Sequence, residues 1–273
     1  MLKDVTLGQY FPGNSILHKL DPRMKLIFSI LYIVLIFLAK GVTAYALVVF
    51  FTVFLIAISK IPVRTILKSL KPLVIVLIIT AFINVFWNGG TTPLFTIWKI
   101  TVYQEGVIRA AAMALRIILL MAGTSVILTY TTSPIALTDA IERLLSPLRV
   151  IKIPVHEFAM MMTIALRFIP TLIEETEKIM NAQKARGADF ESGNLIKKAK
   201  ALVPVLIPLF ISSFRRAEEL ATAMECRCYR GGKGRTRMTV LHLKARDFLF
   251  AFFVCAVITG IVLLNVYFPV YTI

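Results

Sequence analysis

Hydrophobic positions along the chain are grouped into long, nearly uncharged runs separated by shorter polar segments. A helix that crosses the hydrocarbon core of a bilayer needs roughly 20 apolar residues, and flanking residues can complete shorter runs. Five runs fit this description, at about Met24 to Lys40, Val42 to Ser59, Pro72 to Trp87, Val107 to Thr129 and Phe248 to Phe268. The pattern therefore predicts an all-α polytopic membrane protein with about five transmembrane helices.

The composition agrees with a membrane protein and excludes several other classes. The 273 residues are 58% hydrophobic and 17% charged, and the mean hydropathy is +0.80. Disordered chains are poor in aliphatic and aromatic residues, so the 19 Phe of this chain exclude intrinsic disorder. With only 3 Cys, the chain is also unlike a secreted disulfide-rich scaffold.

The net charge of +16 is unevenly distributed, and its distribution predicts the orientation of the chain. Loops that stay on the cytoplasmic side are rich in Lys and Arg. Basic residues are frequent before the first run, between the second and third runs, and in residues 131–246, which hold nineteen. This pattern predicts a cytoplasmic amino terminus and an external carboxyl terminus. It also predicts three parts: a membrane domain at residues 1–130, a cytoplasmic domain at 131–246 and a last span at 247–273.

The cytoplasmic domain begins with signals for two helices. Thr131-Thr132-Ser133-Pro134 places a capping Ser before a Pro at the first helical position, and this helix should end near Leu145. A second helix should start near Val155 and be kinked or interrupted by Pro170. It should stop at Ala185-Arg186-Gly187, where Gly occupies the usual carboxyl-terminal capping place.

A third helix should start near Asn194 and stop at Cys226-Arg227-Cys228, just before Gly231-Gly232. The apolar halves of the second and third helices, residues 158–169 and 201–211, are only 12 and 11 residues long. Such lengths are too short to span a bilayer and favour helices that lie at the cytoplasmic face. We therefore expect three coupling or interfacial helices before the last span.

Two features of the membrane domain depart from plain hydrophobic runs. Residues 94–103 alternate polar and apolar positions after a turn signal at Asn88-Gly89-Gly90, which predicts a short hairpin or an interfacial segment. Arg116 lies about two and a half turns into the fourth run, where a charge is costly. None of the five runs contains Asp or Glu. Arg116 could have a structural role or contact another membrane subunit, and the sequence leaves both open.

The second and third cytoplasmic helices end in the same way, with an Arg flanked by small residues. Small neighbours leave the guanidinium of Arg186 or Arg227 uncovered, and a helix carboxyl terminus favours a positive charge. The fork-shaped donor array of Arg suits a carboxylate on another protein. A single such Arg is an ordinary capping residue, whereas two at matched positions favour a docking surface.

Several motifs, in order along nearly the whole chain, resemble one family: the transmembrane T component of energy-coupling factor (ECF) transporters, a branch of the ATP-binding cassette (ABC) transporters. The motifs are Leu20-Asp21-Pro22-Arg23 with Lys25, Thr131-Thr132-Ser133-Pro134, Ala165-Leu166-Arg167-Phe168-Ile169-Pro170, Ala185-Arg186-Gly187, and Arg216-Ala217-Glu218-Glu219-Leu220-Ala221 leading to Ala223-Met224-Glu225 and Arg227.

The resemblance implies partners and contact residues. Two triplets with a central Arg would dock into two ABC ATPase subunits, here Ala185, Arg186 and Gly187, and Cys226, Arg227 and Cys228. The Cys flanks of the second triplet depart from the commoner small residues. A membrane-embedded substrate-binding S component would contact apolar faces of the same helices. Its candidate contact residues are Phe158, Met161, Met162, Phe168, Leu206 and Phe210; membrane packing explains the Met-rich part equally well.

The resemblance thus implies a non-catalytic, multi-pass subunit of the prokaryotic cytoplasmic membrane. It would couple ATP-driven motions to uptake of vitamins or other micronutrients. ATP and Mg would bind the partner ATPases, and we expect no cofactor, metal or nucleic acid on this chain. The alternatives are a self-sufficient membrane carrier or a membrane-embedded enzyme. Both are disfavoured, because no halves of the chain match and the runs contain no Asp, Glu or His.

Overall fold

The computed structural model describes residues 10–87, 92–97, 100–190, 192, 194–231 and 241–267. The chain forms two compact units. The first, here called the membrane unit, comprises Gly8–Ala140 and Leu241–Ile273. The second comprises Met1–Leu7 and Ile141–Val240 and is here called the α7–α8 unit after its two long helices, α7 (Val155–Ala185) and α8 (Leu195–Cys226). The chain passes from the first unit to the second within α6, between residues 140 and 141, and returns to the first unit between residues 240 and 241.

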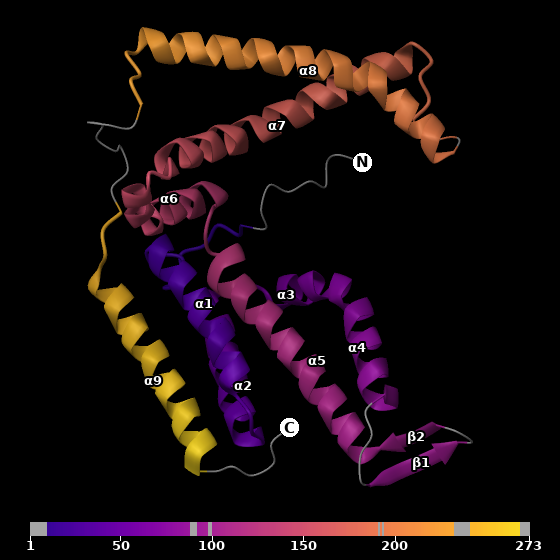
Figure 1. Cartoon of the computed structure of the whole chain (residues 1–273), viewed down its shortest axis with the longest axis vertical. Coiled ribbons are helices and arrows are strands. Elements are labelled where there is room, and N and C mark those ends of the chain that lie inside the picture. The colour runs from indigo at the N-terminus through magenta and orange to yellow at the C-terminus, as the bar shows by residue number, and fades with distance from the viewer. Residues whose placement is uncertain are drawn as a thin grey trace. The chain divides into compact units, whose positions relative to one another are not determined.

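In the described part of the chain, seven helices lie wholly or partly in the membrane unit, and five of them, all except α3 and α6, follow the apolar runs of the sequence (Figure 1). They are α1 (Pro22–Leu38), α2 (Val42–Ser59), α3 (Val63–Leu70), α4 (Val74–Trp87), α5 (Gln104–Thr124), α6 (Pro134–Leu144) and α9 (Ala245–Tyr267). A 3₁₀ turn (Lys71–Leu73) joins α3 to α4, and a π-helical turn (Ser125–Thr129) extends α5. Another 3₁₀ segment (Ser146–Ile151) follows α6.

Among the described residues, five helices are long and apolar enough to cross a membrane: Val42–Ser59, Val63–Phe86, Gln104–Thr129, Val155–Ala185 and Ala245–Tyr267. Four of them overlap predicted spans, although Val63–Phe86 starts nine residues before the predicted Pro72. The remaining predicted span is α1, whose 17 residues reach about 26 Å at ~1.5 Å per residue, close to the thickness of the hydrocarbon core.

The fifth helix of that set, α7, was not predicted to span. Its most apolar window has a mean hydropathy of 1.2, against 2.1 to 2.6 for the other four. Helix α7 is also one helix of 31 residues that continues through Pro170. Of the two predicted effects of Pro170, a kink or an interruption, the interruption is therefore wrong. The carbonyl four residues before a proline loses its helical donor, but a long helix can tolerate that loss.

Two local predictions for the loops are confirmed. The segment between α4 and α5 forms an antiparallel pair of strands, β1 (Pro93–Ile97) and β2 (Ile100–Tyr103), in register from Phe95 opposite Val102 to Ile97 opposite Ile100. The turn signal at residues 88–90 lies outside the described residues. Helix α6 starts at the predicted Pro, and the Oγ of Ser133 accepts a hydrogen bond from the backbone N–H of Ala136 at 3.3 Å.

The core of the membrane unit lies around α1. Its buried side chains Phe28, Tyr32, Leu35 and Ile36 belong to one apolar cluster that also includes residues of α2, α5 and α9. The Tyr32 hydroxyl donates to the carbonyl of Leu119 at 2.9 Å and lies 2.7 Å from the hydroxyl of Thr52. A buried hydroxyl in an apolar medium needs such partners, so this group links α1, α2 and α5.

A buried polar cluster holds the start of α1. The Asp21 side chain caps α1 and pairs with Arg23 at 2.8 Å. The backbone N–H of Asp21 donates to the buried carboxylate of Asp247, in the first turn of α9, at 2.9 Å. Buried Lys25 donates to the carbonyl of Thr131 at 2.8 Å. The family-like motif around Asp21 therefore ties α1 to α9 and to the segment that leads into α6.

Candidate protein-docking site

Helices α7 and α8 form an antiparallel pair, and residue contacts along its length define the register. Gln183, near the carboxyl end of α7, donates from Nε2 to the carbonyl of Pro204, near the start of α8, at 3.5 Å. Glu175 accepts hydrogen bonds from Ser212 and Arg216 farther along α8. The two carboxyl-terminal ends therefore point in opposite directions, and Figure 1 shows the helices crossing.

The contact at Pro204 follows from the prolines of α8. Pro208 has no backbone N–H, so the carbonyl of Pro204, four residues earlier, has no helical donor. The side-chain amide of Gln183 takes the place of that donor. Figure 1 shows α8 changing direction along its length, and Pro204 and Pro208 are the two prolines inside it.

Glu175 is the polar centre of the pair. Its two carboxylate oxygens accept from different donors, Oε1 from the Ser212 hydroxyl and Oε2 from the Arg216 guanidinium. The side chains of Glu175 and Arg216 are 21% and 31% exposed, so this ion pair is shielded more than a surface pair. It fixes the two helices against each other near the middle of α8.

The carboxyl end of α7 is a Schellman motif with Arg186 at the capping position. The backbone N–H of Ala188 donates to the carbonyl of Gln183, and that of Gly187 donates to the carbonyl of Lys184, both at 3.0 Å. Gly187 has a φ of +86°, the left-handed conformation that this motif requires. The predicted glycine cap is therefore confirmed.

The end of α8 repeats this motif, with Arg227 at the capping position. The N–H of Tyr229 donates to the carbonyl of Met224 at 3.0 Å, and that of Cys228 to the carbonyl of Glu225 at 2.8 Å. The left-handed residue is Cys228, with a φ of +57°. The predicted stop at Cys226-Arg227-Cys228 is therefore confirmed, and here a cysteine takes the left-handed conformation that Gly187 takes at the end of α7.

The two capping arginines are exposed and lie at opposite ends of the pair. Within the described residues, neither Arg186 nor Arg227 has an ion pair, whereas Arg216 is paired with Glu175. The two ends are far apart, because the end of α7 contacts α8 at Pro204, and 23 further residues, about 35 Å at ~1.5 Å per residue, lead from there to Arg227. Sequence analysis predicted matched ends but not their opposed positions.

Most of the candidate apolar contact residues are exposed. Phe158 and Met161 of α7 are 58% and 57% exposed, and Leu206 and Phe210 of α8 are 57% and 65% exposed. Met162 is exposed as well. Side chains of this size are normally buried, so the surface is suited to lipid or to a membrane partner.

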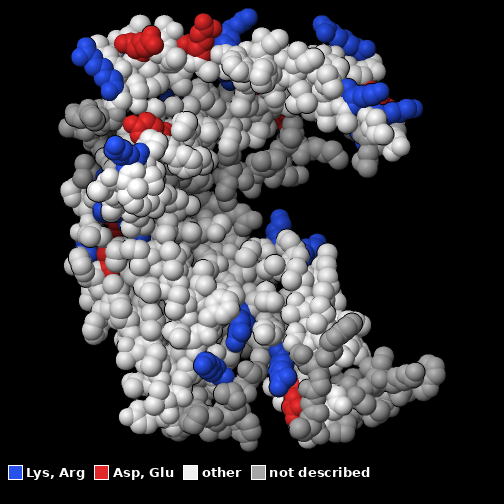
Figure 2. Space-filling model, in the orientation of Figure 1, with Lys and Arg blue, Asp and Glu red and all other residues white. Residues whose placement is uncertain are grey.

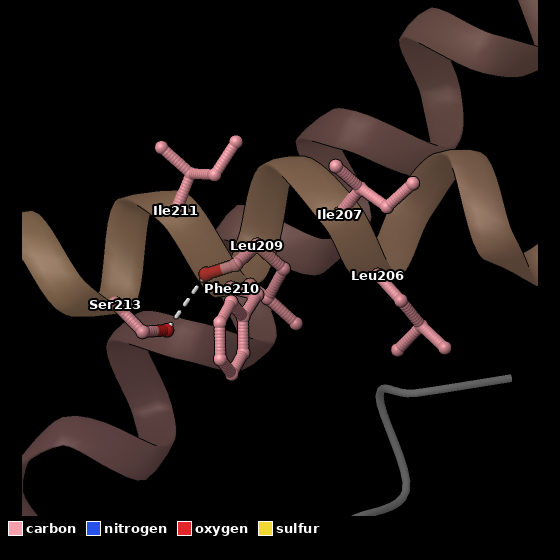
Figure 3. A pocket seen from close by; sticks show the side chains of 6 residues that line it. All are labelled: Leu206, Ile207, Leu209, Phe210, Ile211 and Ser213. Carbon is pink, nitrogen blue, oxygen red and sulfur yellow. Dashed lines mark hydrogen bonds between the residues drawn. The ribbon is translucent and has the colours of Figure 1, made fainter.

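On α8, these side chains surround an open apolar depression of about 490 Å³ (Figure 3). Figure 3 shows Leu206 and Phe210 projecting from one side of the helix and Ile207 and Ile211 from the other. Ser213 does not add a free polar group here, because its hydroxyl donates to the carbonyl of Leu209 at 2.7 Å.

Phe168 differs from the other candidate residues. It is half-buried and lines a smaller groove of about 250 Å³ between α7 and α8, together with Leu172, Leu220 and Met224. Its ring therefore contributes to the contact between the two helices. Spacing on α7 alone could not separate Phe168 from the exposed set, because the partner helix decides which side is covered.

A protein-family model described as "Cobalt transport protein" matches residues 13–238. The energy-coupling factor transporter transmembrane protein EcfT of Clostridium kluyveri is 60% identical over 250 residues, which cover 91% of this chain and 92% of that protein. Its counterpart in Ruminiclostridium cellulolyticum is 52% identical over 268 residues, covering 97% and 98%. That of Bacillus subtilis is 45% identical over 247 residues, covering 90% and 93%.

The chain belongs to the family of energy-coupling factor transporter transmembrane proteins. The resemblance inferred from the motifs is thus confirmed, and the self-sufficient carrier and the membrane enzyme are not supported. As a member of this family with several long apolar helices, the chain is a multi-pass protein of the bacterial cytoplasmic membrane and a component of a transporter. The matched segment contains both capping arginines and the Glu175 cluster.

Charged side chains of this ECF transmembrane component are unequally divided on the face that Figure 2 draws. In Figure 2, blue and red side chains gather over α7 and α8, whereas the membrane unit is largely white with isolated charges. Groups of three or more His, Cys, Asp or Glu that could hold a metal ion are absent from the described residues. Cys226 and Cys228 are exposed free thiols. The site is therefore one of cationic helix ends and apolar surface.

Proposed function

We propose that this chain is the mechanical link of an ECF-type importer, joining two ABC ATPase subunits to a substrate-binding S component. One ATPase would bind the end of α7 through Ala185, Arg186 and Gly187. The other would bind the end of α8 through Cys226, Arg227 and Cys228. An acidic groove on each ATPase would receive the guanidinium.

The observation that carries this proposal is the repetition of one Schellman motif, with an exposed Arg at its cap, at the two opposite ends of a single braced helix pair. The motif consumes the last backbone donors and acceptors of each helix and leaves the Arg side chain uncovered. Ends that are far apart can contact two separate subunits, whereas adjacent ends would favour one.

Transmission would follow from the contacts between α7 and α8. Movement of either ATPase would act on one helix end, and the Glu175 cluster would carry that movement to the other helix. The exposed apolar residues Phe158, Met161, Met162, Leu206 and Phe210 would then shift the S component. Flexible Met side chains suit a surface that accepts more than one partner.

In this proposal the chain is not itself an enzyme. ATP and Mg would bind the ATPases, and substrate would bind the S component, so vitamins or other micronutrients would pass without contacting a catalytic group of this chain. The absence of acidic residues and His from the predicted membrane runs supports this division of roles.

Co-purification from membranes tests the docking assignment. Tagged wild type should retain two ATPase copies, whereas Arg186→Glu and Arg227→Glu should each weaken binding and the double variant should abolish it. Arg215→Glu is a matched control, because Arg215 is an exposed arginine in the interior of α8. Mass spectrometry identifies the retained proteins, and membrane insertion is checked by fractionation.

Retention of both ATPases by a membrane-inserted double variant would contradict the proposal. Equal loss in the Arg215→Glu control would show that general surface charge, and not the helix ends, holds the ATPases. Loss of one ATPase copy in each single variant would support one docking site at each end.

A further inference from the structure

Arg116 of α5 has a protein partner in the structure, but that partner is neutral. Its Nε donates to the hydroxyl of Tyr45 at 2.7 Å. Its Cζ lies 5.7 Å from the ring centroid of Tyr45 and 5.8 Å from that of Phe37. The structural role left open by the sequence is therefore partly realised, because the rings of Phe37 and Tyr45 and the hydroxyl of Tyr45 hold the guanidinium in one orientation.

These contacts leave the charge and most of the donors of Arg116 without a complement. A guanidinium has five N–H donors. Apart from the bond to Tyr45, its contact within the described residues is a weak one from Nη1 to the sulfur of Met113 at 4.0 Å. None of the predicted spans contains a carboxylate. Because the side chain is only half-buried, an external anion can reach the free N–H groups.

The surrounding helices place the guanidinium close to one membrane surface. Phe37 is one residue from the end of α1 at Leu38, and Tyr45 is three residues from the start of α2 at Val42. At ~1.5 Å per residue, both are within about 5 Å of those helix ends. Helix α1 is just long enough to cross the hydrocarbon core, so its ends reach the headgroup region.

Counting along α5 alone gives a different depth. Arg116 is twelve residues after the first residue of α5, Gln104, and lies near the middle of the helical segment that ends at Thr129. Its contacts with the ends of α1 and α2 show that the guanidinium is at the level of the short connection around Lys40. Long basic side chains commonly extend toward the interface in this way.

We propose that Arg116 is a binding site for the phosphodiester of an anionic glycerophospholipid in the leaflet next to the α1–α2 connection. The planar guanidinium presents paired donors that fit two phosphate oxygens. Tyr45 is a positioning residue, because its hydroxyl occupies Nε and its ring lies against the guanidinium. A second cation, Arg109, is seven residues earlier on the same face of α5 and is exposed.

The level of the guanidinium favours lipid over the other candidate anion, a carboxylate of a neighbouring membrane subunit. Lipid phosphates are present at this level of the bilayer whether or not a partner subunit is bound. A carboxylate on a neighbouring membrane subunit would be costly to keep at this level whenever the two subunits separate. The site does not depend on the docking role proposed for Arg186 and Arg227.

Titration of phosphatidylglycerol into the delipidated full-length chain, followed by native mass spectrometry, tests the site. Phosphatidylcholine serves as the zwitterionic comparison. We expect Arg116→Gln to weaken the tightest phosphatidylglycerol site about tenfold or more, the loss that fits one charge-assisted contact. Arg116→Lys should retain part of the affinity, since it keeps the charge without the fork.

Arg64→Gln is the matched control, because Arg64 is an exposed arginine of α3 and should leave the tightest site unchanged. Tyr45→Phe keeps the ring and removes the hydroxyl, so it should weaken the site several-fold. If Arg116→Gln fails to fold, the phosphatidylglycerol affinity of Tyr45→Phe tests the proposal in its place. Unchanged phosphatidylglycerol affinity in Arg116→Gln, or in Tyr45→Phe when the other variant does not fold, overturns the proposal. Loss of a co-purifying membrane subunit with lipid affinity unchanged would overturn it in favour of the carboxylate.

Discussion

Gly123 of α5 lies against the ring of Tyr32 of α1, so closely that a Cβ atom at residue 123 would lie 2.2 Å from Cε1 and Cζ of that ring. The same Tyr32 donates from its hydroxyl to the carbonyl of Leu119, one turn earlier on α5. The close approach of α1 and α5 and the hydrogen bond of the buried Tyr32 hydroxyl therefore both depend on residue 123 being a glycine. Small residues commonly permit such approach between helices in membranes.

Replacing Gly123 by Ala should destabilise the membrane unit. The added methyl group would force Tyr32 out of its position, and overpacking of this kind costs about 1–3 kcal/mol. Thermal unfolding of the purified protein in detergent measures the effect. Gly260→Ala is the matched control, because a Cβ there would lie 3.9 Å from Leu47, an ordinary contact. Equal stability of the two variants would show that α1 and α5 are not closely packed at residue 123.

Substitutions at the left-handed residues that cap α7 and α8 should change the stability of the two helix ends in opposite directions. Gly187→Ala adds a Cβ to a residue with φ +86°; no atom lies within 4 Å, so the cost of about 1–2 kcal/mol is conformational. Cys228→Gly removes a Cβ from a residue with φ +57° and should stabilise its cap by about 1 kcal/mol. Hydrogen exchange of the amides at residues 187 and 228 measures both local changes.

Cys228→Ala controls for loss of the thiol at the second cap, since it keeps the Cβ. It should leave exchange close to that of wild type. If Cys228→Gly and Gly187→Ala both accelerated exchange, Cys228 would not be in the left-handed conformation in solution.

Breaking the Glu175 cluster should separate ATP hydrolysis from transport. Glu175→Gln removes the charge that pairs with Arg216 and should lower stability by about 1–2 kcal/mol, because the pair is partly shielded. If α7 and α8 move as a coupled pair, the assembled complex should keep its ATPase subunits but transport less substrate for each ATP hydrolysed. Uptake and phosphate release measured in the same proteoliposomes give this ratio.

Glu174→Gln is the control for that experiment, because Glu174 is the exposed neighbour of Glu175 on α7. A Glu175→Arg and Arg216→Glu exchange should recover part of the stability lost in either single variant. An unchanged transport ratio in Glu175→Gln would show that the ion pair only holds the helices and does not transmit movement.

Local patterns in the sequence determined most of the elements and the residues at their ends. Apolar runs were sufficient for α2, α4, α5 and α9, because a membrane helix satisfies its backbone internally and its length follows from bilayer thickness. The cap at Ser133 and the glycine at Gly187 were recognisable for a similar reason, since capping uses neighbouring backbone groups. The predicted orientation and docking residues stay predictions.

Only the tertiary structure decided how separate elements meet. The bond between Asp21 and Asp247 joins residues 226 positions apart, and that between Arg116 and Tyr45 joins residues 71 apart. Periodicity along one helix carries no information on which helix covers which side, so it could not distinguish half-buried Phe168 from exposed Phe158. The opposed positions of Arg186 and Arg227 likewise follow from antiparallel packing of α7 on α8, which side-chain contacts between the two helices determine.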